Sequence, residues 1–303
     1  MAHWSDQKDR GDFMWLSLLA WCASRFGRNF LRVICALVAL FFLLTAAEPR
    51  RASRRYLDKV LNRPATMKDT LVHFYTFALV SVDRLMFLSG RGDNLTLRLQ
   101  GEDIVHRFAR ERRGCILLVS HVGSFDAMRV PAVEEEDIPI RILIHKKHNP
   151  DAMRVIEKLN PGLAADAIDA GMPATQLVLA VGDALEQGEM VGIMADRASR
   201  DESLVPARFL GGQADFPRGP WLLALALKAP VILCFAVYEG KSRYSVRFTL
   251  VDDGSPARRR EREGRLQQGL YRYVSELEAV VRAHPYNWFN FYDFWSNQSS
   301  RHN

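Results

Sequence analysis

The feature that most constrains the fold of this 303-residue chain is a repeated alternation of short apolar runs with helical segments. Continuous apolar runs of four to eight residues are typical of buried parallel strands. We expect four such strands, over residues 115–119, 138–144, 190–194 and 231–238. Helices are expected between them, over 150–159 (opened by Asn149 and Pro150), 173–188 and 220–228. The alternation predicts an α/β fold with a mostly parallel sheet flanked by helices.

The remaining patterned segments complete this prediction. Residues 56–90 carry apolar positions at three- and four-residue spacing, which predicts a helix, and residues 95–99 alternate like a strand. Residues 244–251 also alternate, and Gly240 precedes them, so they are expected to form an antiparallel hairpin with 231–238. A long amphipathic helix is expected over 262–283. The length fits one α/β domain with an N-terminal attachment.

Two apolar stretches, 13–24 and 33–47, lie near the N-terminus, and the second carries no charge. Four arginines follow it, at positions 50, 51, 54 and 55. Arginines beside an apolar segment stay on the cytoplasmic side and attract anionic lipid, at about 1 kcal/mol per residue. We therefore predict an N-terminal membrane anchor or pair of interfacial helices over 1–48 and a catalytic domain over 49–303.

Two alternatives remain open for this region. The second stretch is shorter than the roughly 20 apolar residues of a membrane span, so the segment either spans or lies in the interface. The other interpretation is a pair of buried helices in a soluble bundle. A secretory signal fits poorly, because Asp6, Asp9 and Asp12 make the leader acidic.

Charge and cysteine content narrow the function classes only partly. The net charge of +6 suits anionic lipid, nucleic acid or an acidic carrier protein. No nucleic-acid-binding motif accompanies it. The four cysteines are far apart and form no C-x-x-C pair, which excludes a zinc knuckle or dithiol motif and favours buried thiols.

The segment that carries chemistry begins directly after the strand predicted over 115–119. His121 follows the strand, where side chains emerge at the carboxyl edge of an α/β sheet, and Asp126 comes five residues later. Five residues on a continuous helix would separate the two side chains by about 140°, so they meet only if the chain bends. Gly123 permits such a bend, and Ser124 is a suitable N-cap for a helix starting near Phe125.

In that geometry, Asp126 would accept a hydrogen bond from one imidazole nitrogen of His121, leaving the other nitrogen to act as a general base. The spacing alone is weak, since a histidine capped by a nearby carboxylate at a strand end would look the same. A hydrolase is a rival, although the segment around Ser124 lacks the G-x-S-x-G elbow of a serine nucleophile. A non-catalytic membrane-binding module is another rival.

The wider sequence resembles the lysophospholipid acyltransferase superfamily, whose signature is His-x-x-x-x-Asp/Glu after a strand. Within it, the chain resembles the late acyltransferases of lipid A biosynthesis and, more closely, predicted acyltransferases encoded with aryl-polyene pigment pathways. The segments that carry the resemblance are RRASRRYL at 50–57, SHVGSFD at 120–126, VGIMADR at 191–197, FLGGQADFPRGP at 209–220 and PYNWFNFYDFW at 285–295. The lipid A enzymes usually carry Glu in place of Asp126.

The resemblance implies a glycerol-3-phosphate-acyltransferase-like fold and a dyad of His121 as base and Asp126 as its orienter. It also implies an acyl carrier protein or acyl-CoA donor, an amphiphilic lipid or glycolipid acceptor, and a location on the cytoplasmic face of a bacterial inner membrane. The acceptor expected from the closer resemblance is a pigment-linked lipid. Lipid A is the alternative, and a membrane-bound esterase is less favoured. The dyad requires no cofactor or metal, so activity is expected to survive chelation by EDTA.

Other residues are candidates for substrate binding. Asp196 and Arg197 follow the strand predicted over 190–194 and share its edge with His121, where they form either a structural ion pair or a substrate contact. Lys146 and Lys147 follow another predicted strand and would contact a phosphate or an acidic carrier.

Arg218 opens a predicted helix, whose first amides would receive an anion unless the segment is simply a helix start. His145 and His148 flank the lysine pair but lack a third ligand for a metal, so a basic surface loop is favoured. The aromatic run over 286–295 is expected to pack the C-terminus onto the core, with an interfacial aromatic belt as the alternative.

Overall fold

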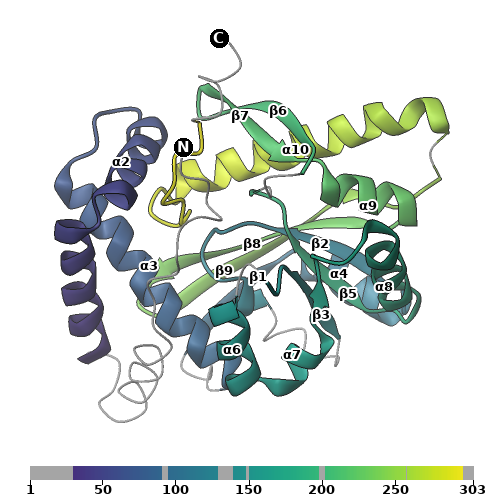
Figure 1. Ribbon diagram of the computed structural model, residues 1–303, viewed down its shortest axis with the longest axis horizontal. Helices are drawn as coiled ribbons and strands as arrows, with labels where there is room; N and C mark the ends of the chain where they lie inside the picture. Colours follow the sequence, from purple (N-terminus) through teal and green to yellow (C-terminus); the bar gives the residue numbers. More distant parts are fainter. Residues whose placement is uncertain are drawn as a thin grey trace.

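A seven-stranded sheet forms the centre of the protein (Figure 1). The computed structural model describes residues 30–90, 95–128, 139–147, 150–197, 202–256 and 258–295. The strand order is β1-β9-β8-β2-β5-β3-β4. Its strands are β1 (Thr96–Gln100), β2 (Cys115–Val119), β3 (Ile140–Ile144), β4 (Ile168–Asp169), β5 (Met190–Met194), β8 (Val231–Gly240) and β9 (Arg243–Asp252).

Five neighbouring strands of this sheet, β8, β2, β5, β3 and β4, run parallel. β9 is antiparallel to β8, and β1 pairs with β9 in parallel. The mostly parallel sheet with a late hairpin is therefore confirmed. Because the five parallel strands end at one edge, the residues that follow each of them gather there.

Helices cover both faces of the sheet. The helices labelled in Figure 1 are α2 (Ala47–Leu61), α3 (Met67–Leu88), α4 (Glu102–Arg110), α6 (Pro150–Leu159), α7 (Pro161–Asp166), α8 (Ala174–Glu186), α9 (Gly219–Leu227) and α10 (Arg262–Ala283), of which α2 lies beside the sheet. Every residue of β2 is buried, and alternate residues face opposite sides. Leu118 packs in the cluster that contains α10, whereas Leu117 packs in the cluster that contains α3 and α4. This two-sided burial explains why β2 is a continuous apolar run.

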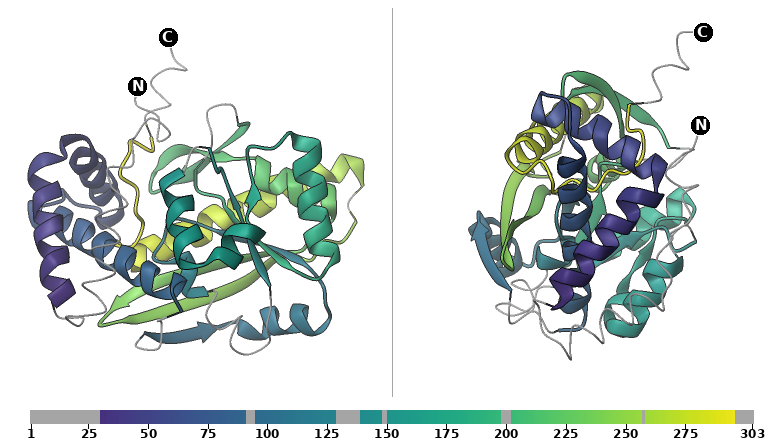
Figure 2. Two further views of the ribbon diagram at one scale, coloured as in Figure 1. Left: turned by 60° about the horizontal axis from the view of Figure 1, so that its bottom comes forward. Right: turned by 90° about the vertical axis from the view of Figure 1, so that its left-hand side faces the viewer.

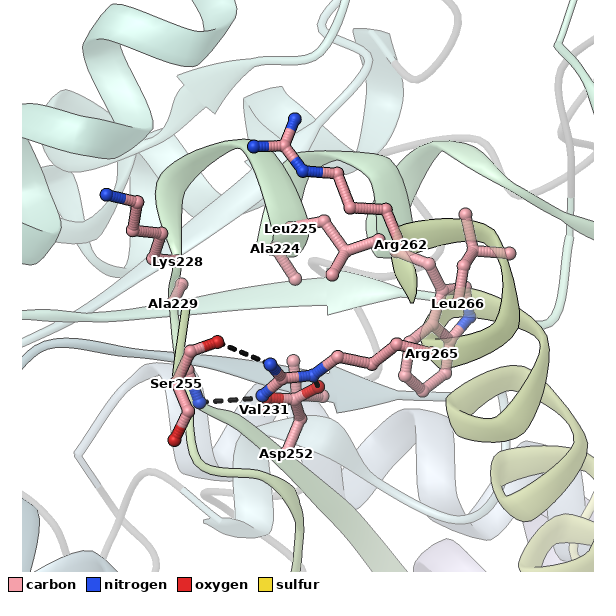
Figure 3. Close-up of a pocket in the computed structure, with 12 residues that line it drawn as sticks. Ala224, Leu225, Lys228, Ala229, Val231, Asp252, Ser255, Arg262, Arg265 and Leu266 are labelled. Carbon is pink, nitrogen blue, oxygen red and sulfur yellow. Dashed lines mark hydrogen bonds and ion pairs between the residues drawn. The ribbon is translucent and has the colours of Figure 1, made fainter. Parts of the chain in front are cut away.

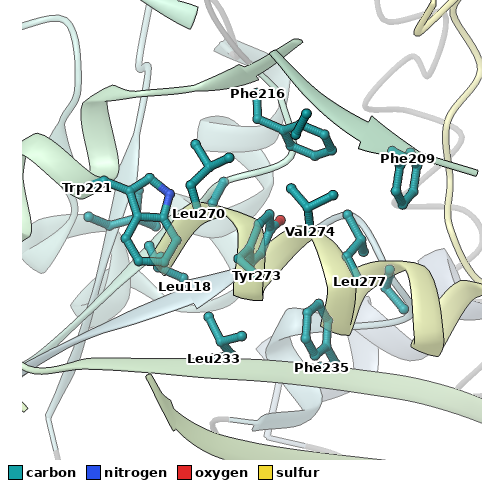
Figure 4. Packing of buried hydrophobic residues seen from close by; sticks show 14 of the residues in the cluster. Leu118, Phe209, Phe216, Trp221, Leu233, Phe235, Leu270, Tyr273, Val274 and Leu277 are labelled. Carbon is teal, nitrogen blue, oxygen red and sulfur yellow. The ribbon is translucent and has the colours of Figure 1, made fainter. Parts of the chain in front are cut away.

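The long helix α10 lies between the sheet and a small β-hairpin. Figure 4 shows its buried face, with Leu270, Tyr273 and Leu277 directed at neighbouring side chains of the core. The hairpin consists of β6 (Leu204–Phe209) and β7 (Gly212–Pro217), which pair antiparallel. The sequence analysis predicted α10 with its observed bounds but assigned no structure to the hairpin.

Three helices form an N-terminal group to one side of the sheet, seen face-on in the right-hand view of Figure 2. The helix over Phe30–Thr45 meets α2 at a bend of 99°. It packs on α3 through two apolar clusters, one around Leu31, Cys35 and Val82 and the other around Ala39, Leu43 and Phe74. The predicted boundary at residue 48 lies just inside α2, and the division into two domains stays a prediction.

The single helix predicted over 56–90 is wrong, because α2 ends at Leu61 and α3 begins at Met67. Asn62 adopts a left-handed backbone conformation with φ 52°, which ends α2. Pro64 follows, and Thr66 and Asp69 form a reciprocal capping box at the start of α3. By length and composition α3 is apolar enough to cross a membrane, but half of its most apolar window is buried inside the protein.

The outer face of the helix over Phe30–Thr45 is an exposed apolar stripe. Its members recur at three- and four-residue spacing and are 43–68% exposed: Phe30, Val33, Leu37, Leu40, Phe41 and Leu44. Soluble surfaces carry isolated apolar side chains, but a contiguous stripe of this kind marks a surface that contacts a partner or lipid.

Candidate active site

His121 and Asp196 meet at the carboxyl edge of the sheet because of the register between β2 and β5. The two strands are parallel neighbours in which Val119 aligns with Met194. The residues two positions beyond each strand are therefore brought side by side. The Nδ1 atom of His121 lies 2.8 Å from Oδ1 of Asp196, and the backbone N–H of His121 donates to Oδ2 at 3.0 Å.

The carboxylate of Asp196 is fully buried and receives three hydrogen bonds. Besides the two from His121, the indole Nε1–H of Trp288 donates to Oδ2 at 2.9 Å. Burial alone would raise the pKa of Asp196, but His121, Arg197 and the Trp288 hydrogen bond together hold that pKa well below its usual value. An ionised carboxylate only accepts hydrogen bonds, so Nδ1 of His121 carries the proton and Nε2 keeps its lone pair.

The surroundings of His121 favour its neutral form. Its pKa lies below the usual 6.5, chiefly because of burial and then because of the positive charge of Arg197. Asp196 opposes this shift, and Arg84 adds to it. The side chain is nevertheless 32% exposed, so a partner can reach the imidazole. A neutral, oriented and accessible imidazole is the arrangement that a general base requires.

A C-terminal segment holds the backbone on which His121 sits. Val122 pairs antiparallel with Trp288, and the N–H of Phe289 donates to the carbonyl of His121 at 2.9 Å. Arg197 donates to the carbonyl of Phe289 at 2.6 Å and places its guanidinium over the ring of Tyr292. The prediction that the aromatic run packs the C-terminus onto the core is confirmed, since Trp288, Phe289 and Phe294 are buried.

The bend expected after His121 is present. Gly123 has φ 58°, and a Cβ atom there would lie 1.8 Å from the carbonyl oxygen of Ala236 in β8, so only glycine fits. Residues 125–128 form the helical turn that was predicted to start near Phe125. The hydroxyl of Ser124 is buried and makes no hydrogen bond within the described residues, so it does not cap this turn.

Asp126 is engaged by an arginine and not by His121. Its carboxylate accepts a hydrogen bond from Nε of Arg84 in α3 at 2.8 Å. Asp126 is buried, whereas the side chain of Arg84 is 46% exposed. In the described part of the chain no hydrogen bond joins Asp126 to His121. The carboxylate that contacts the imidazole of His121 is that of Asp196, in place of the expected Asp126. A catalytic role for Asp126 stays a prediction.

The remaining candidates fall in different places. Lys146 and Lys147 lie in the turn after β3, at the same sheet edge as His121, where Asp169 accepts from the backbone N–H of Lys146 at 3.2 Å. Arg218 forms an ion pair with Glu263 at the start of α10. Within the residues described, no hydrogen bond or ion pair links Arg218 to His121 or Asp196.

The N-terminus of α9 already faces a carboxylate of the chain itself. An added Cβ at Gly219 would lie 2.5 Å from an oxygen of Glu202. A carboxylate of the chain itself therefore lies beside the start of α9, where an external anion would have to bind. His148 lies outside the described residues, and no group of three metal-ligating side chains occurs within them.

A small cavity lies at the opposite edge of the sheet, between α9 and the start of α10 (Figure 3). It is lined by Val231, the first residue of β8, and by Asp252, the last residue of β9. Arg265, which pairs with Asp252, also lines it. A volume of ≈ 20 Å³ is room for about one water molecule. None of the candidate site residues lines this cavity, so we do not assign it to substrate.

A neutral imidazole held by a buried carboxylate at the edge of a parallel α/β sheet is typical of enzyme sites suited to general acid–base chemistry. The family model for bacterial lipid A biosynthesis acyltransferases matches residues 7–297, which is nearly the whole chain. The chain belongs to this family and is an acyltransferase. No curated protein matches it.

Proposed function

We propose that this acyltransferase moves an acyl chain from a thioester, carried by acyl carrier protein or coenzyme A, to a hydroxyl or amine of a membrane lipid. The observation that carries the proposal is the His121–Asp196 pair, which leaves Nε2 unprotonated on a side chain that is 32% exposed. The family match supports acyl transfer to a lipid-like acceptor.

In the proposed reaction, Nε2 of His121 takes the proton from the acceptor hydroxyl or amine as its oxygen or nitrogen attacks the thioester carbonyl carbon. The tetrahedral intermediate then collapses, the carbon–sulfur bond breaks, and the imidazolium returns its proton to the departing thiolate. Asp196 holds the tautomer and stabilises the transient imidazolium through its 2.8 Å contact with Nδ1. Removing such a base typically costs about 10²–10⁴-fold in rate.

Arg84 and Asp126 are assigned a supporting role in this site. Asp126 holds Arg84 through Nε alone, and within the described residues both terminal nitrogens of the guanidinium are without a hydrogen-bond partner. A guanidinium held in this way is suited to an anionic oxygen, either on a phosphorylated substrate or on the tetrahedral intermediate. Asp126 would then serve the reaction by positioning Arg84.

The exposed apolar stripe is assigned to the membrane interface. Its helix is about 24 Å long over Phe30–Thr45, shorter than the roughly 30 Å hydrocarbon core of a bilayer, and its inner face is occupied by α3. A helix covered by protein on one side and apolar on the other fits partial insertion into one leaflet. In a bacterium, a carrier-protein or coenzyme A donor places this leaflet on the cytoplasmic face of the inner membrane.

The arginines of α2 flank this surface. Arg51 and Arg54 are exposed and have no hydrogen-bond or ion-pair partner within the described residues. Arg50, in contrast, donates to the carbonyls of Leu43 and Leu44 at the end of the preceding helix, and Arg55 pairs with Asp293. Two free guanidinium groups beside an apolar stripe suit an anionic membrane surface.

The acceptor has two candidates. The resemblance to aryl-polyene-associated enzymes favours a pigment-linked glycolipid or glycerolipid. The family description favours lipid A. Lipid mass spectrometry of a deletion strain and its parent, complemented with wild-type or His121→Ala protein, separates them. We expect one lipid class to lose the mass of one acyl group unless the wild-type gene is restored. An unchanged lipidome, or restoration by His121→Ala, would contradict the proposed function.

A further inference from the structure

We propose that Trp288 is a positioning residue for the His121–Asp196 pair and ties this pair to helices α2 and α3 through His73 and Ser53. The inference rests on the proposed role of His121 as the general base. Trp288 lies in the aromatic run over 286–295, which was predicted to pack the C-terminus onto the core, with an interfacial aromatic belt as the alternative.

Trp288 is held through its indole N–H and its backbone carbonyl. Its indole N–H donates to Oδ2 of Asp196 at 2.9 Å, and its backbone carbonyl accepts from Nε2 of His73 at 2.9 Å. Trp288, Asp196 and His73 are all fully buried, so no solvent competes for these hydrogen bonds. The ring packs edge-on against Tyr56 of α2, with 5.0 Å between the ring centroids.

The hydrogen bonds continue into the N-terminal helices. A carbonyl oxygen only accepts, so Nε2 of His73 carries its proton and Nδ1 is an acceptor. The hydroxyl of Ser53 in α2 lies 2.8 Å from this Nδ1 and donates to it. An unbroken chain therefore runs from Ser53 through His73, Trp288 and Asp196 to His121.

The hydrogen bond from Trp288 differs from the other two hydrogen bonds to Asp196 in the residue that donates it. Both of those come from His121 itself, one from its backbone and one from its ring. Among the described residues, the indole alone fixes the carboxylate to a separate part of the protein. Without it, Asp196 is free to turn with His121, and its negative charge is left less satisfied in a dry site.

This chain also gives the apolar stripe a physical route to the active site. The stripe belongs to the helix that packs on α3, and α3 carries both His73 and Arg84. A shift of α2 and α3 at the membrane would move Trp288 and, through it, Asp196. The positioning role of Trp288 is the first link that must hold for such coupling.

The test uses the full-length protein and reads His121 directly, without any acyl substrate. Diethyl pyrocarbonate modifies neutral imidazoles, and peptide mass spectrometry reports the rate at His121 as a function of pH. We expect Trp288→Phe to shift the midpoint of this curve to higher pH, because a carboxylate with one fewer donor binds the imidazolium more strongly. The other charges that face His121, Arg197 and Arg84, are unchanged. Acyl transfer should fall about 10- to 100-fold with little change in KM.

Trp295→Phe is the matched control. Trp295 packs against Trp288 in the same aromatic cluster, but its buried indole N–H makes no hydrogen bond within the described residues. The Trp295→Phe variant should leave the midpoint of the pH curve for His121 modification unchanged. If Trp288→Phe does not fold, replacement of Trp288 by 3-benzothienylalanine keeps the bicyclic shape and removes only the N–H.

The decisive variant is whichever of Trp288→Phe and the 3-benzothienylalanine protein is folded. If its midpoint for His121 modification and its rate of acyl transfer equal those of Trp295→Phe, the inference is overturned. That outcome is distinct from failure of the proposed function, which His121→Ala tests by acyl transfer. His73→Phe, which removes the donor to the Trp288 carbonyl, should shift the midpoint in the same direction. An unshifted His73→Phe protein would overturn the link to α2 and α3.

Discussion

The guanidinium of Arg84 donates to the carboxylate of Asp126 across 2.8 Å, so the acid of the His-x-x-x-x-Asp signature is paired with an arginine from α3. The histidine of the same signature is paired with Asp196, 75 residues further along the chain. The signature therefore brings His121 and a carboxylate that holds an arginine to one sheet edge, while the carboxylate that contacts the imidazole follows the neighbouring strand β5.

The two carboxylates should differ in a direct comparison of variants. In Asp196→Asn, a carboxamide faces Nδ1 of His121. This change reverses the imidazole tautomer and removes the free lone pair at Nε2, so acyl transfer should fall by about 10³–10⁴-fold. His121→Ala should be equally inactive. Asp126→Asn still accepts from Arg84 and should lose only about tenfold. Purified folded variants are compared by transfer of labelled acyl chains to membrane lipid. A larger loss for Asp126→Asn than for Asp196→Asn would restore the pairing expected from the spacing.

Replacing Arg84 should move the acid limb of the pH–rate profile. The positive charge of Arg84 helps to keep the pKa of His121 below 6.5, so Arg84→Gln should raise that pKa. The base must be neutral, and the fall of kcat/KM on acidification should therefore begin at a higher pH in the variant. Arg98→Gln, on β1 and paired with Glu239, is the control and should leave the limb in place. An unmoved limb in Arg84→Gln would place this arginine outside the field felt by His121.

Polar substitutions in the apolar stripe should weaken binding to lipid vesicles. Leu37 and Leu44 are 62% and 68% exposed, and burying each contributes about 1–2 kcal/mol. The double variant Leu37→Asn/Leu44→Asn should therefore lose about 2–4 kcal/mol and bind roughly 30- to 700-fold more weakly in a flotation assay. The control is Leu179→Asn/Leu222→Asn, which alters two exposed leucines on α8 and α9. Equal loss in both double variants would show that the stripe is not the contact surface.

The free arginines of α2 should matter only on anionic vesicles. Arg51→Ala/Arg54→Ala should lower the binding free energy by about 2 kcal/mol, or roughly 30-fold in affinity. The difference should vanish on neutral phosphatidylcholine vesicles and shrink in high salt. Arg259→Ala/Arg260→Ala removes the same charge from exposed positions before α10 and serves as the control. A loss of binding that persists on neutral vesicles would contradict an electrostatic contact.

Acid should destabilise the protein in part through His73. Burial lowers the pKa of His73 to about 4, against the usual 6.5 for an exposed histidine. Above pH 6.5 both folded and unfolded states are neutral. Between pH 6.5 and 4 only the unfolded state takes up the proton, so folding loses stability as the pH falls, by about 3 kcal/mol in total.

His73→Gln keeps a donor and an acceptor but does not titrate. Its free energy of unfolding, measured with urea, should therefore fall less than that of the wild type over this window. Parallel curves for the two proteins would show that the unfolded state does not gain this proton from His73.

The sequence predicted the strands around the site well, because β2, β5 and β8 are buried on both faces and so consist of continuous apolar residues. The bend was also predicted, from the glycine at position 123. The structure explains why glycine is required there, since no other residue tolerates the close approach of Ala236. The break between α2 and α3 was missed, although Pro64 and the Thr66–Asp69 capping box signal it in the sequence. The β6–β7 hairpin was missed as well, despite the turn at Leu210 and Gly211, both of which have positive φ.

The partner of His121 could not be derived from local spacing. Asp196 was placed at the correct edge, but its contact with His121 depends on which strands are neighbours and on their register. Several arrangements of four parallel strands satisfy the same apolar pattern, and they differ in whether β5 lies beside β2. Trp288 was hidden for the same reason, because its hydrogen bonds join residues 92 and 215 positions away.

The apolar stripe also governs how the isolated protein behaves in water. Six large side chains on one helix face cannot be covered by the helix itself, so removal of lipid or detergent leaves contact with another copy as the nearest way to hide them. Such a pair would be joined face to face through Phe30–Thr45, with both apolar stripes occluded and both proposed membrane contacts blocked. Oligomers that form in plain buffer and dissociate in detergent are thus a consequence of the missing lipid. If these oligomers are inactive, their inactivity is no test of the role of His121.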